Sequence, residues 1–523
     1  MILDELYSPA QKFTDQKTLN LIRDGKTKGG FQVESTLLSS YSKKLKPDTI
    51  DDLSILISAV RPGCLEVTDD ATGLNMAQLL CARKNHEQPI IHEFPILAKH
   101  LEETYGVIVY QEQIIEIVKD IGGFSLQDAD ALRKACGKKL ADEMAKVKLT
   151  FIEGCKRTGK VNAEDAEKIW SWIEKSQRYL FNKSHGYSYA MLAYITLYFK
   201  ANYQDEFYIA WLRHSKEKSN PFEEVRLLVN DAKANGFEVL PPCLSLKNEL
   251  FEMMTIKGQK FIAYGLSNIR NLGKTAFSTL QGLLLGANAP IIGDWDTFCL
   301  FALMNLNHTT VKSLICSGAI DEFKVPRQKM LYEYNNLRDT LKDNDLKYLK
   351  DQTGTILERL ETIQLGTKIN NRKLPAKKIG QIHSLVSSLK NPPYALVDSI
   401  DFLAFNEELY LGVSLSCSAI DDKNVSAANC SVGDLAKGQV GEYICVGAVI
   451  DSVKPFTLKK GKNKGSSMAF ISISDGSGVM ESVAFAEVFK EYESVLTEKN
   501  TVLLRGKYQR EKKSFIIEKA WQV

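Results

Sequence analysis

Several features are missing from this sequence of 523 residues, and each absence excludes a class of protein. It has no run of about 18 apolar residues, the length that a membrane-spanning helix needs. None of its ten cysteines belongs to a Cys-x-x-Cys pair, so the usual spacing of zinc fingers, zinc ribbons and thioredoxin-like sites is absent. The first residues, Met1–Glu5, are acidic and lack a signal-peptide pattern. We expect a cytoplasmic protein with reduced thiols and no membrane partner.

Neither sign of charge is in large excess, since 67 Lys and Arg stand against 64 Asp and Glu. The surplus lies in residues 426–523, which carry 14 basic and 11 acidic residues. A nearly neutral chain can still bind nucleic acid, because local clusters of charge decide binding. The hydrophobic content of 44% is ordinary for a globular protein, and the length corresponds to about three or four domains.

The residue pattern predicts a multidomain α+β protein with four regions. Residues 1–245 are expected to form a mostly helical region. Residues 246–335 begin with a β-hairpin that turns at Lys257-Gly258 and continue with short helical hairpins. Residues 336–425 favour a helical connector. Residues 426–523 alternate apolar and polar residues with period two, which predicts a small barrel of about five strands, similar to an OB fold.

The densest motif lies between residues 122 and 139. Ser125 can cap a helix there, with Asp128 three residues later. The helix places Arg133, Lys134 and Lys138 off its apolar stripe, an arrangement that suits phosphate binding. A solvated surface helix explains the same pattern. The stripe itself consists of Leu126, Ala129, Leu132 and Cys136.

A second motif places consecutive hydrogen-bond donors at a predicted helix start, which is a natural anion site. The aromatic stripe that follows can be either core or a base-stacking platform, and a lone histidine is as easily structural as functional. The donors are Asn182, Lys183, Ser184 and His185, and the stripe is Tyr187, Ala190, Tyr194 and Tyr198.

A third motif, Ile269–Ala276, contains Gly273-Lys-Thr275, which resembles the end of a phosphate-binding P-loop. The P-loop requires a glycine five residues earlier, where this chain has Asn268, so we reject that interpretation. The spacing favours a helix-hairpin-helix turn that offers backbone N–H groups to one DNA phosphate. A plain helical turn remains an alternative, and Leu314–Asp321 resembles a second, degenerate copy. The expected DNA contacts are Asn271, Gly273, Lys274 and Thr275.

The barrel region carries two basic turns between strands that bear aromatic residues, which suits binding of single-stranded DNA. A solubilising hairpin is the alternative. The first turn contributes Lys459, Lys460, Lys462 and Lys464, and the second group is Arg505, Lys507, Arg510, Lys512 and Lys513.

No metal centre is predicted. The Asp-x-Asp pairs are Asp128/Asp130, Asp294/Asp296 and Asp343/Asp345. Residues two apart on a helix point away from each other, so the first and third pairs cannot converge on an ion. Asp294 and Asp296 are typical of a helix start.

Taken together, the motifs resemble the alpha subunit of bacterial replicative DNA polymerase III, a C-family polymerase. The resemblance extends over nearly the whole chain, and the motifs follow one another in the family's order. Besides the helix-hairpin-helix and the barrel, the matching stretches are Gly30–Ser35, Arg61–Gly63, Glu103–Gln113, Ala129–Lys139, Phe181–His185, Val239–Pro242 and Tyr410–Gly412.

The resemblance covers the C-terminal part of the family's architecture: fingers, little finger with the helix-hairpin-helix, and OB domain. It implies that the PHP domain, palm and thumb would precede Met1, so that the catalytic aspartates and the Mg²⁺ they bind belong to a partner chain. This is similar to half of a split polymerase, as a phage encodes, or to an expressed fragment. The implied location is the cytoplasm of a bacterium or of a phage-infected host.

By resemblance, Arg133 and Lys134 bind the triphosphate of the incoming dNTP, with Lys138 beside them. Lysine at position 134 keeps the charge of the family's usual arginine but loses its bidentate geometry. Asn182 to His185 match a fingers motif near the nascent base pair, and Gln111–Gln113 match a supporting motif. A sliding clamp is a further implied partner, for which Gln381–Leu385 is a weak candidate peptide.

Two classes of function follow. In the first, the chain is a polymerase subunit that contacts dNTP, primer–template and single-stranded DNA while the partner supplies the palm. In the second, it is a non-catalytic DNA-binding module that keeps the fingers as scaffold. The complete motif from Arg133 to Lys139 favours the first class.

Overall fold

The computed structural model describes residues 13–523 except 139–140, 178, 286–292, 370–371, 439, 442, 459–464 and 510–513. The chain divides into two compact units, Met1–Tyr208 and Ile209–Val523. The division into four regions expected from the sequence stays a prediction. The fold class is confirmed: a mostly helical N-terminal part precedes a C-terminal closed β-barrel.

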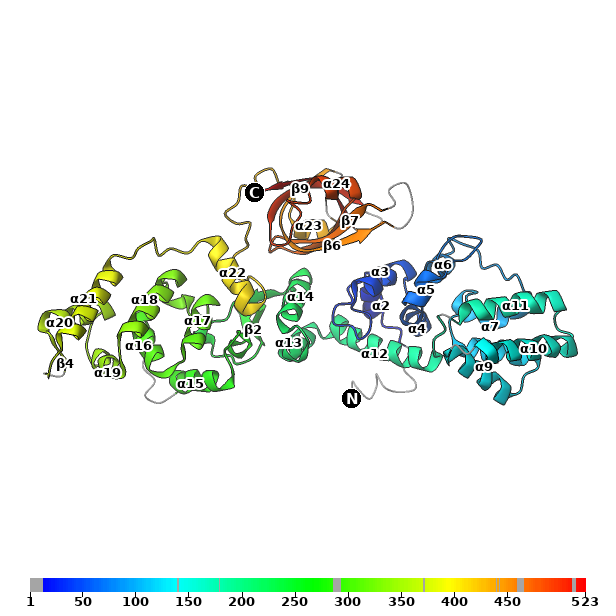
Figure 1. The fold of residues 1–523 in the computed structure, drawn as a ribbon, viewed down its shortest axis with the longest axis horizontal. Coiled ribbons are helices and arrows are strands. Elements are labelled where there is room, and N and C mark those ends of the chain that lie inside the picture. Colours follow the sequence, from blue (N-terminus) through cyan, green and yellow to red (C-terminus); the bar gives the residue numbers. More distant parts are fainter. Residues whose placement is uncertain are drawn as a thin grey trace. The chain divides into compact units, whose positions relative to one another are not determined.

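Every named element of the first unit is a helix, as expected for this part of the chain (Figure 1). Most begin at a side chain that accepts a hydrogen bond from the first turn, such as Asp15, Ser35 and Thr49. The α-helices are α2 (Gln16–Arg23), α3 (Thr36–Leu45), α4 (Ile50–Ala59), α5 (Pro62–Glu66), α6 (Met76–Lys84), α7 (Ala98–Leu101), α8 (Gln111–Gly122), α9 (Leu126–Lys138), α10 (Ala141–Thr158), α11 (Ala163–Ser176) and α12 (Lys183–Asn202); α13 (Gln204–His214) runs across the division.

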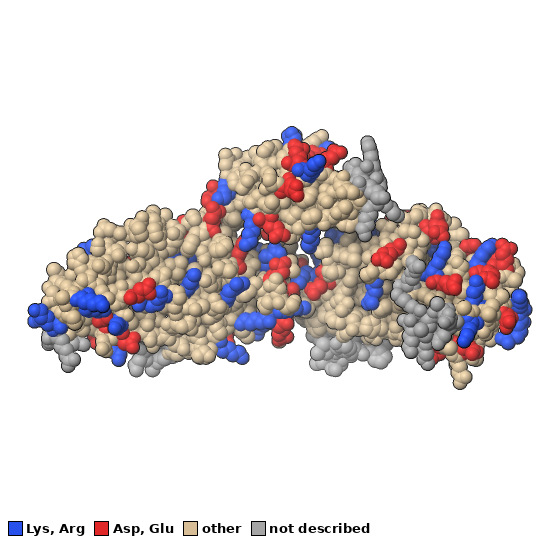
Figure 2. Space-filling view, viewed as in Figure 1, with Lys and Arg blue, Asp and Glu red and all other residues tan. Residues whose placement is uncertain are grey.

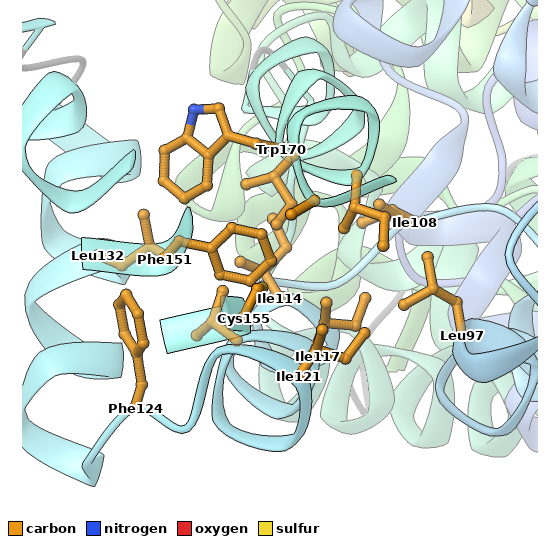
Figure 3. Close-up of a cluster of buried hydrophobic side chains, with 14 of the residues drawn as sticks. Leu97, Ile108, Ile114, Ile117, Ile121, Phe124, Leu132, Phe151, Cys155 and Trp170 are labelled. Atoms are coloured by element: carbon orange, nitrogen blue, oxygen red, sulfur yellow. The ribbon is translucent and has the colours of Figure 1, made fainter. Parts of the chain in front are cut away.

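One core of this unit lies among α8, α9, α10 and α11. Phe151 of α10 packs against Trp170 of α11 and Phe124 before α9, with ring centroids 5.5 and 6.3 Å apart (Figure 3). Helix α9 contributes Ala129 and Leu132, both fully buried. Burial of these side chains fixes which face of α9 is turned away from the core.

The α9 stripe is shorter than expected, because Leu126 is 70% exposed. At 3.6 residues per turn, Leu126 points about 90° away from the direction midway between Ala129 and Leu132. The first turn therefore carries this leucine off the buried face. Cys136, the fourth predicted member, has a side chain outside the described residues.

A second core forms where α12 packs on α2 and α4. Gly186 allows the close approach, since a Cβ atom there would lie 2.5 Å from the Ser58 hydroxyl of α4. Tyr194 is buried, and its hydroxyl accepts the Asp15 N–H at 2.8 Å. Tyr187, Ala190, Tyr194 and Tyr198 all belong to this core, so the core interpretation of the α12 stripe is confirmed.

The second unit contains a small sheet in the order β1-β3-β2, which follows its first helix. Strands β2 (Glu252–Ile256) and β3 (Gln259–Ala263) form the predicted hairpin, and β1 (Glu238–Leu240) pairs in parallel with β3. The turn residues Lys257 and Gly258 have φ of 51° and 83°, as a tight two-residue hairpin turn requires.

Helices make up most of the second unit before the barrel (Figure 1). They are α14 (Pro221–Ala234), α15 (Lys274–Leu285), α16 (Trp295–Asn305), α17 (His308–Cys316), α18 (Arg327–Thr340), α19 (Asp343–Lys350), α20 (Ile356–Gly366), α21 (Ala376–Lys390) and α22 (Ile400–Leu411), with the short strand pair β4 (Lys368–Ile369) and β5 (Arg372–Lys373) between α20 and α21.

The C-terminal barrel is closed, with strand order β10-β8-β7-β6-β9. Strands β8 and β10 are parallel and α24 lies between β8 and β9, which is the OB-fold arrangement and confirms the predicted OB-like barrel. The barrel elements are α23 (Val432–Lys437), β6 (Tyr443–Thr457), β7 (Ser467–Ser474), β8 (Val479–Ala484), α24 (Ala486–Glu491), β9 (Thr501–Gln509) and β10 (Ser514–Gln522).

Candidate nucleotide and nucleic-acid interfaces

The start of α12 is organised by Asn182. Its side-chain oxygen accepts the His185 N–H at 2.8 Å, and its amide nitrogen donates to Glu112 at 2.8 Å. Asn182 is therefore the N-cap of the helix rather than a free donor. Ser184 and His185 are exposed at the same helix end.

Protein carboxylates fill the anion position predicted at this helix start. Glu112 accepts the Lys183 N–H at 2.9 Å, and Glu103 accepts the Lys183 ammonium at 2.6 Å. Negative charge is favoured here because the first N–H groups of a helix have no partner within it. Two of the four expected donors, Asn182 and Lys183, are thus engaged by acidic side chains from the Glu103–Gln113 motif.

Backbone pairing joins the same two motifs. The Gln111 N–H donates to the Phe181 carbonyl, and the Phe181 N–H donates to the Val109 carbonyl, each at 2.9 Å. Gln113 is buried; its oxygen accepts two backbone N–H groups and its nitrogen donates to the Thr104 hydroxyl at 2.7 Å. These contacts fit the supporting role expected for this motif.

An aromatic row of exposed and half-buried rings runs beside the first turns of α12, with His185 and Tyr189 on the side of the helix opposite Tyr194. The His185 ring lies 3.9 Å from the Tyr189 ring and 5.4 Å from Phe181, and Phe31 lies 5.1 Å from Tyr189. The Arg61 guanidinium sits 3.9 Å from the centre of the Phe181 ring. Flat rings and guanidinium planes of this kind are the groups on which bases stack.

The residue pattern alone did not predict this row. His185 and Tyr189 are four residues apart and share a helix face, which the sequence could have revealed. Phe31 and Arg61 come from distant motifs, and only the fold brings them to α12. Burial lowers the pKa of Arg61, since desolvation disfavours its charged form.

The start of α9 matches the prediction. The Ser125 hydroxyl accepts the Asp128 N–H at 3.2 Å and donates to the Asp128 carboxylate at 2.7 Å. Arg133, Lys134 and Lys138 belong to α9, but their side chains lie outside the described residues.

The predicted helix-hairpin-helix turn is exposed in front of α15. Asn271 adopts a φ of 65° and Gly273 has open space where a Cβ would stand. Phe277 is the first residue of α15 whose backbone N–H donates a hydrogen bond to the turn; its acceptor is the Gly273 carbonyl, at 3.0 Å. The N–H groups before it have no acceptor within α15, and Lys274 and Thr275 are exposed beside them. The element before the turn is only a 3₁₀ turn, Leu266–Asn268.

The second, degenerate hairpin is closed rather than open. Gly318 has a φ of 77°, and the space beside its Cα is filled by the Arg327 guanidinium. Arg327 is 2% exposed and pairs with Asp321 at 2.6 Å and with Glu407 at 2.8 Å. The space beside Gly318 is therefore taken by a side chain of this chain, unlike the open space at Gly273.

On the barrel, exposed aromatic side chains stand on the outer surface. Phe470 of β7 is 43% exposed and pairs across the sheet with Lys454 of β6, while Phe456 is 48% exposed. Lys459, Lys460, Lys462 and Lys464 lie outside the described residues, as do Arg510, Lys512 and Lys513.

In the part of the chain that the structure describes, no group of three or more His, Cys, Asp or Glu is placed to hold a metal ion. Asp294 caps α16 and Asp296 accepts the Ile356 N–H at 2.9 Å, as expected for helix-start residues. The Mg²⁺ implied by the resemblance therefore has no fitting set of ligands among the described residues.

On the face shown in Figure 2, basic and acidic side chains are interspersed, which fits the small net charge of +3. Within the described ranges, no helix has the length and apolar character to cross a bilayer. The candidate clamp peptide Gln381–Leu385 lies inside α21 with Ile382 and Leu385 buried, so it is not offered as an extended peptide.

A helical region, an exposed hairpin and an OB-like barrel are the parts of a nucleic-acid-binding protein. Comparison with known proteins is more specific. Residues 8–159 match the bacterial DNA polymerase III alpha subunit finger domain. The chain is 32% identical to DNA polymerase III subunit alpha of Aquifex aeolicus over 94% of its length and 37% of that protein.

Other relatives give the same result. Identity is 30% with DNA polymerase III subunit alpha of Borreliella burgdorferi and 28% with that of Bacillus subtilis, in each case over 97% of this chain and 41% of the relative. The chain is thus homologous to DNA polymerase III alpha subunits along almost all of its length. It spans about two fifths of the length of these relatives.

Proposed function

We propose that this chain supplies the fingers, the helix-hairpin-helix and the OB domain of a replicative DNA polymerase. A partner chain supplies the PHP domain, the thumb and the catalytic palm with its Mg²⁺. The complex acts in the cytoplasm of a bacterium or of a phage-infected host and takes dNTP and primer–template DNA. The homology over 94% of the chain supports this assignment.

In this proposal, the nucleotide meets the first unit. Arg133, Lys134 and Lys138 of α9 bind the triphosphate, because clustered cations on an exposed helix face make charge-assisted hydrogen bonds. Asn182 and Lys183 position the start of α12 through Glu112 and Glu103. Ser184 and His185 then face the nascent base pair, with the aromatic row of α12 as a stacking surface.

DNA meets the second unit. The exposed turn at Asn271, Gly273, Lys274 and Thr275 binds a backbone phosphate of the duplex. The barrel, through Phe456, Phe470 and the lysines at 459, 460, 462 and 464, holds the single strand. A sliding clamp is a further partner of this complex.

One observation carries the proposal. Four motifs that are far apart in the sequence meet at the start of α12: Phe31, Arg61, the Glu103–Gln113 motif and Phe181–His185. Where they meet, Phe31, Arg61 and His185 stay exposed beside the half-buried rings of Phe181 and Tyr189, and exposed aromatic and cationic side chains that gather in this way support a binding surface.

The test is primer extension with purified chain, Mg²⁺ and four dNTPs, with and without a palm-bearing partner. We expect no templated extension by the chain alone and robust extension by the complex. Extension by the chain alone would contradict the division of labour. If the chain binds primer–template tightly and Arg133→Ala leaves primer extension by the complex unchanged, the alternative of a non-catalytic DNA-binding module is supported instead.

A further inference from the structure

A cavity of about 380 Å³ lies directly behind the helix-hairpin-helix turn. One wall is the turn itself, from Ser267 to Gly273. The other is formed by the 3₁₀ turn η3 (Ser215–Glu217) and the first residues of α14, including Phe222. Residues far apart in the sequence therefore enclose a space next to the expected DNA contact.

The lining of this cavity is cationic. It contains Lys216 and Arg270 and no acidic residue. The Lys216 ammonium donates to the Ser267 carbonyl, and the Arg270 guanidinium lies 4.4 Å from the centre of the Phe222 ring. Among the described residues, neither cation forms an ion pair.

The charge of Lys216 is not balanced by its surroundings. Partial burial lowers its pKa, the nearby Lys274 lowers it further, and Glu249 only partly opposes this. When folding lowers the pKa of a basic side chain, its charged form is destabilised, and a negative charge bound nearby stabilises that form. Gly273, which lines the cavity, directly precedes α15, so the cavity adjoins the start of that helix.

Three polar atoms at the cavity have no hydrogen-bond partner in the described structure. They are the Ser267 hydroxyl, the Asn268 amide oxygen and Arg270 Nε. Ser267 is 4% exposed and Asn268 is 6% exposed, so solvent does not replace the missing partner freely. The Asn268 amide can present its nitrogen after a half-turn, so each of the three residues has a side-chain group that can donate a hydrogen bond.

We propose that this cavity receives a phosphate of the DNA backbone, held by Lys216, Arg270 and Ser267. It is the neighbour of the phosphate that the exposed turn binds, so the inference rests on the proposed function of that turn. A phosphate diester matches the lining because it offers negative charge and several acceptor oxygens and needs no carboxylate partner. The turn and the cavity next to it then contact two phosphates of the DNA backbone.

The experiment measures binding of the full chain to a primer–template duplex between 50 and 200 mM salt. Lys216→Gln removes one cavity charge. Lys218→Gln is the matched control, because Lys218 is exposed two residues away, over the Trp211 ring at 4.9 Å, and does not line the cavity. Each phosphate contact contributes about 0.9 to the salt slope of duplex binding, so its loss weakens binding about eightfold at 0.1 M salt.

We expect Lys216→Gln to lower the slope by about 0.9, with Arg270→Gln in the same range, while Lys218→Gln changes affinity less than about twofold. Duplexes with single neutral methylphosphonates identify the phosphate: one substitution should weaken wild type but not Lys216→Gln. Equal slopes for wild type, Lys216→Gln and Arg270→Gln would overturn the cavity as a phosphate site.

Two outcomes separate this inference from the proposed function. If Lys274→Gln weakens duplex binding while Lys216→Gln does not, the turn binds DNA and the cavity does not. If neither variant changes binding, the turn assignment fails together with the cavity. In a second arm, inorganic phosphate at fixed ionic strength should raise the melting temperature of wild type more than that of Lys216→Gln; an equal rise in both would contradict the cavity site.

Discussion

Arg327 offers the sharpest test of how the second unit is held together. It is 2% exposed, and its partner Glu407 is fully buried. Burial by itself would lower the pKa of Arg327, but hydrogen bonds and charge from Asp321 and Glu407 raise it above its usual range. Glu407 also accepts N–H groups from Leu415 and Ser416 at 2.6 and 2.9 Å. One ionic cluster thus ties α18, the closed hairpin and the segment after α22.

Arg327→Met should destabilise this unit by about 3–5 kcal/mol, because it leaves the Glu407 carboxylate buried without a cation. The free energy of unfolding of a folded domain is only roughly 5–15 kcal/mol in total, so this loss is large. Urea unfolding followed by circular dichroism measures it, and with a slope of roughly 2 kcal/mol per M the midpoint should fall by about 2 M.

The matched control is Arg338→Met in the same helix. Arg338 pairs with Asp339 at 2.7 Å, but its side chain is 36% exposed and that of Asp339 is 65% exposed, so the loss should stay below about 1 kcal/mol. Adding Glu407→Gln to Arg327→Met should recover part of the stability, since a neutral amide oxygen still accepts the two N–H groups. If Arg327→Met unfolds within 1 kcal/mol of wild type, the reasoning about the buried charge is wrong.

Three other predictions concern the nucleotide site, the barrel and pH. In the reconstituted complex, Arg133→Ala should lower kcat/KM for dNTP about 10- to 150-fold with unchanged primer–template affinity, as single-nucleotide incorporation would measure; an unchanged value removes Arg133 from the site. Replacing Lys459, Lys460, Lys462 and Lys464 by Ser should weaken single-stranded DNA binding by residues 426–523 and flatten its salt dependence, whereas an unaltered slope would refute that turn as a contact. Burial raises the pKa of Asp451 from 3.8 to about 6, against the opposing effects of Arg226 and Ser474, so the folded state favours the protonated form. Its contribution to stability is therefore complete below about pH 4 and is lost as pH rises through about 6; Asp451→Asn should remove a loss on the order of 2 kcal/mol, and denaturation curves at pH 4.5 and 7.5 that change equally in both proteins would contradict this.

Local patterns in the sequence predicted the elements that depend on near neighbours. The hairpin at Lys257-Gly258, the cap at Ser125 and the OB-like barrel were all correct, because turn chemistry, capping and period-two alternation are written in adjacent residues. Leu126 was placed wrongly, since it lies in the first turn, at the edge of the buried face, where the apolar period does not decide exposure.

The candidate sites depended on contacts between distant residues, which no local pattern contains. Glu103 and Glu112 occupy the helix start that was expected to stay open, 80 and 71 residues before their partner Lys183. Arg327 fills the second hairpin although nothing in Leu314–Asp321 indicates it. The cavity beside Ser267 is lined in part by Lys216, which lies 51 residues earlier in the sequence, just after α13.

The pairing of Val109–Gln111 with Phe181 has a mechanical consequence. The chain enters the bundle of α8, α9, α10 and α11 at Tyr110 and leaves it at Phe181, and two backbone hydrogen bonds of 2.9 Å join these points. The two points where the chain enters and leaves the bundle are therefore joined directly to each other. Asn182 and Lys183 follow directly after this junction, so in the proposed complex a rotation of the bundle about the junction would also move the first turn of α12.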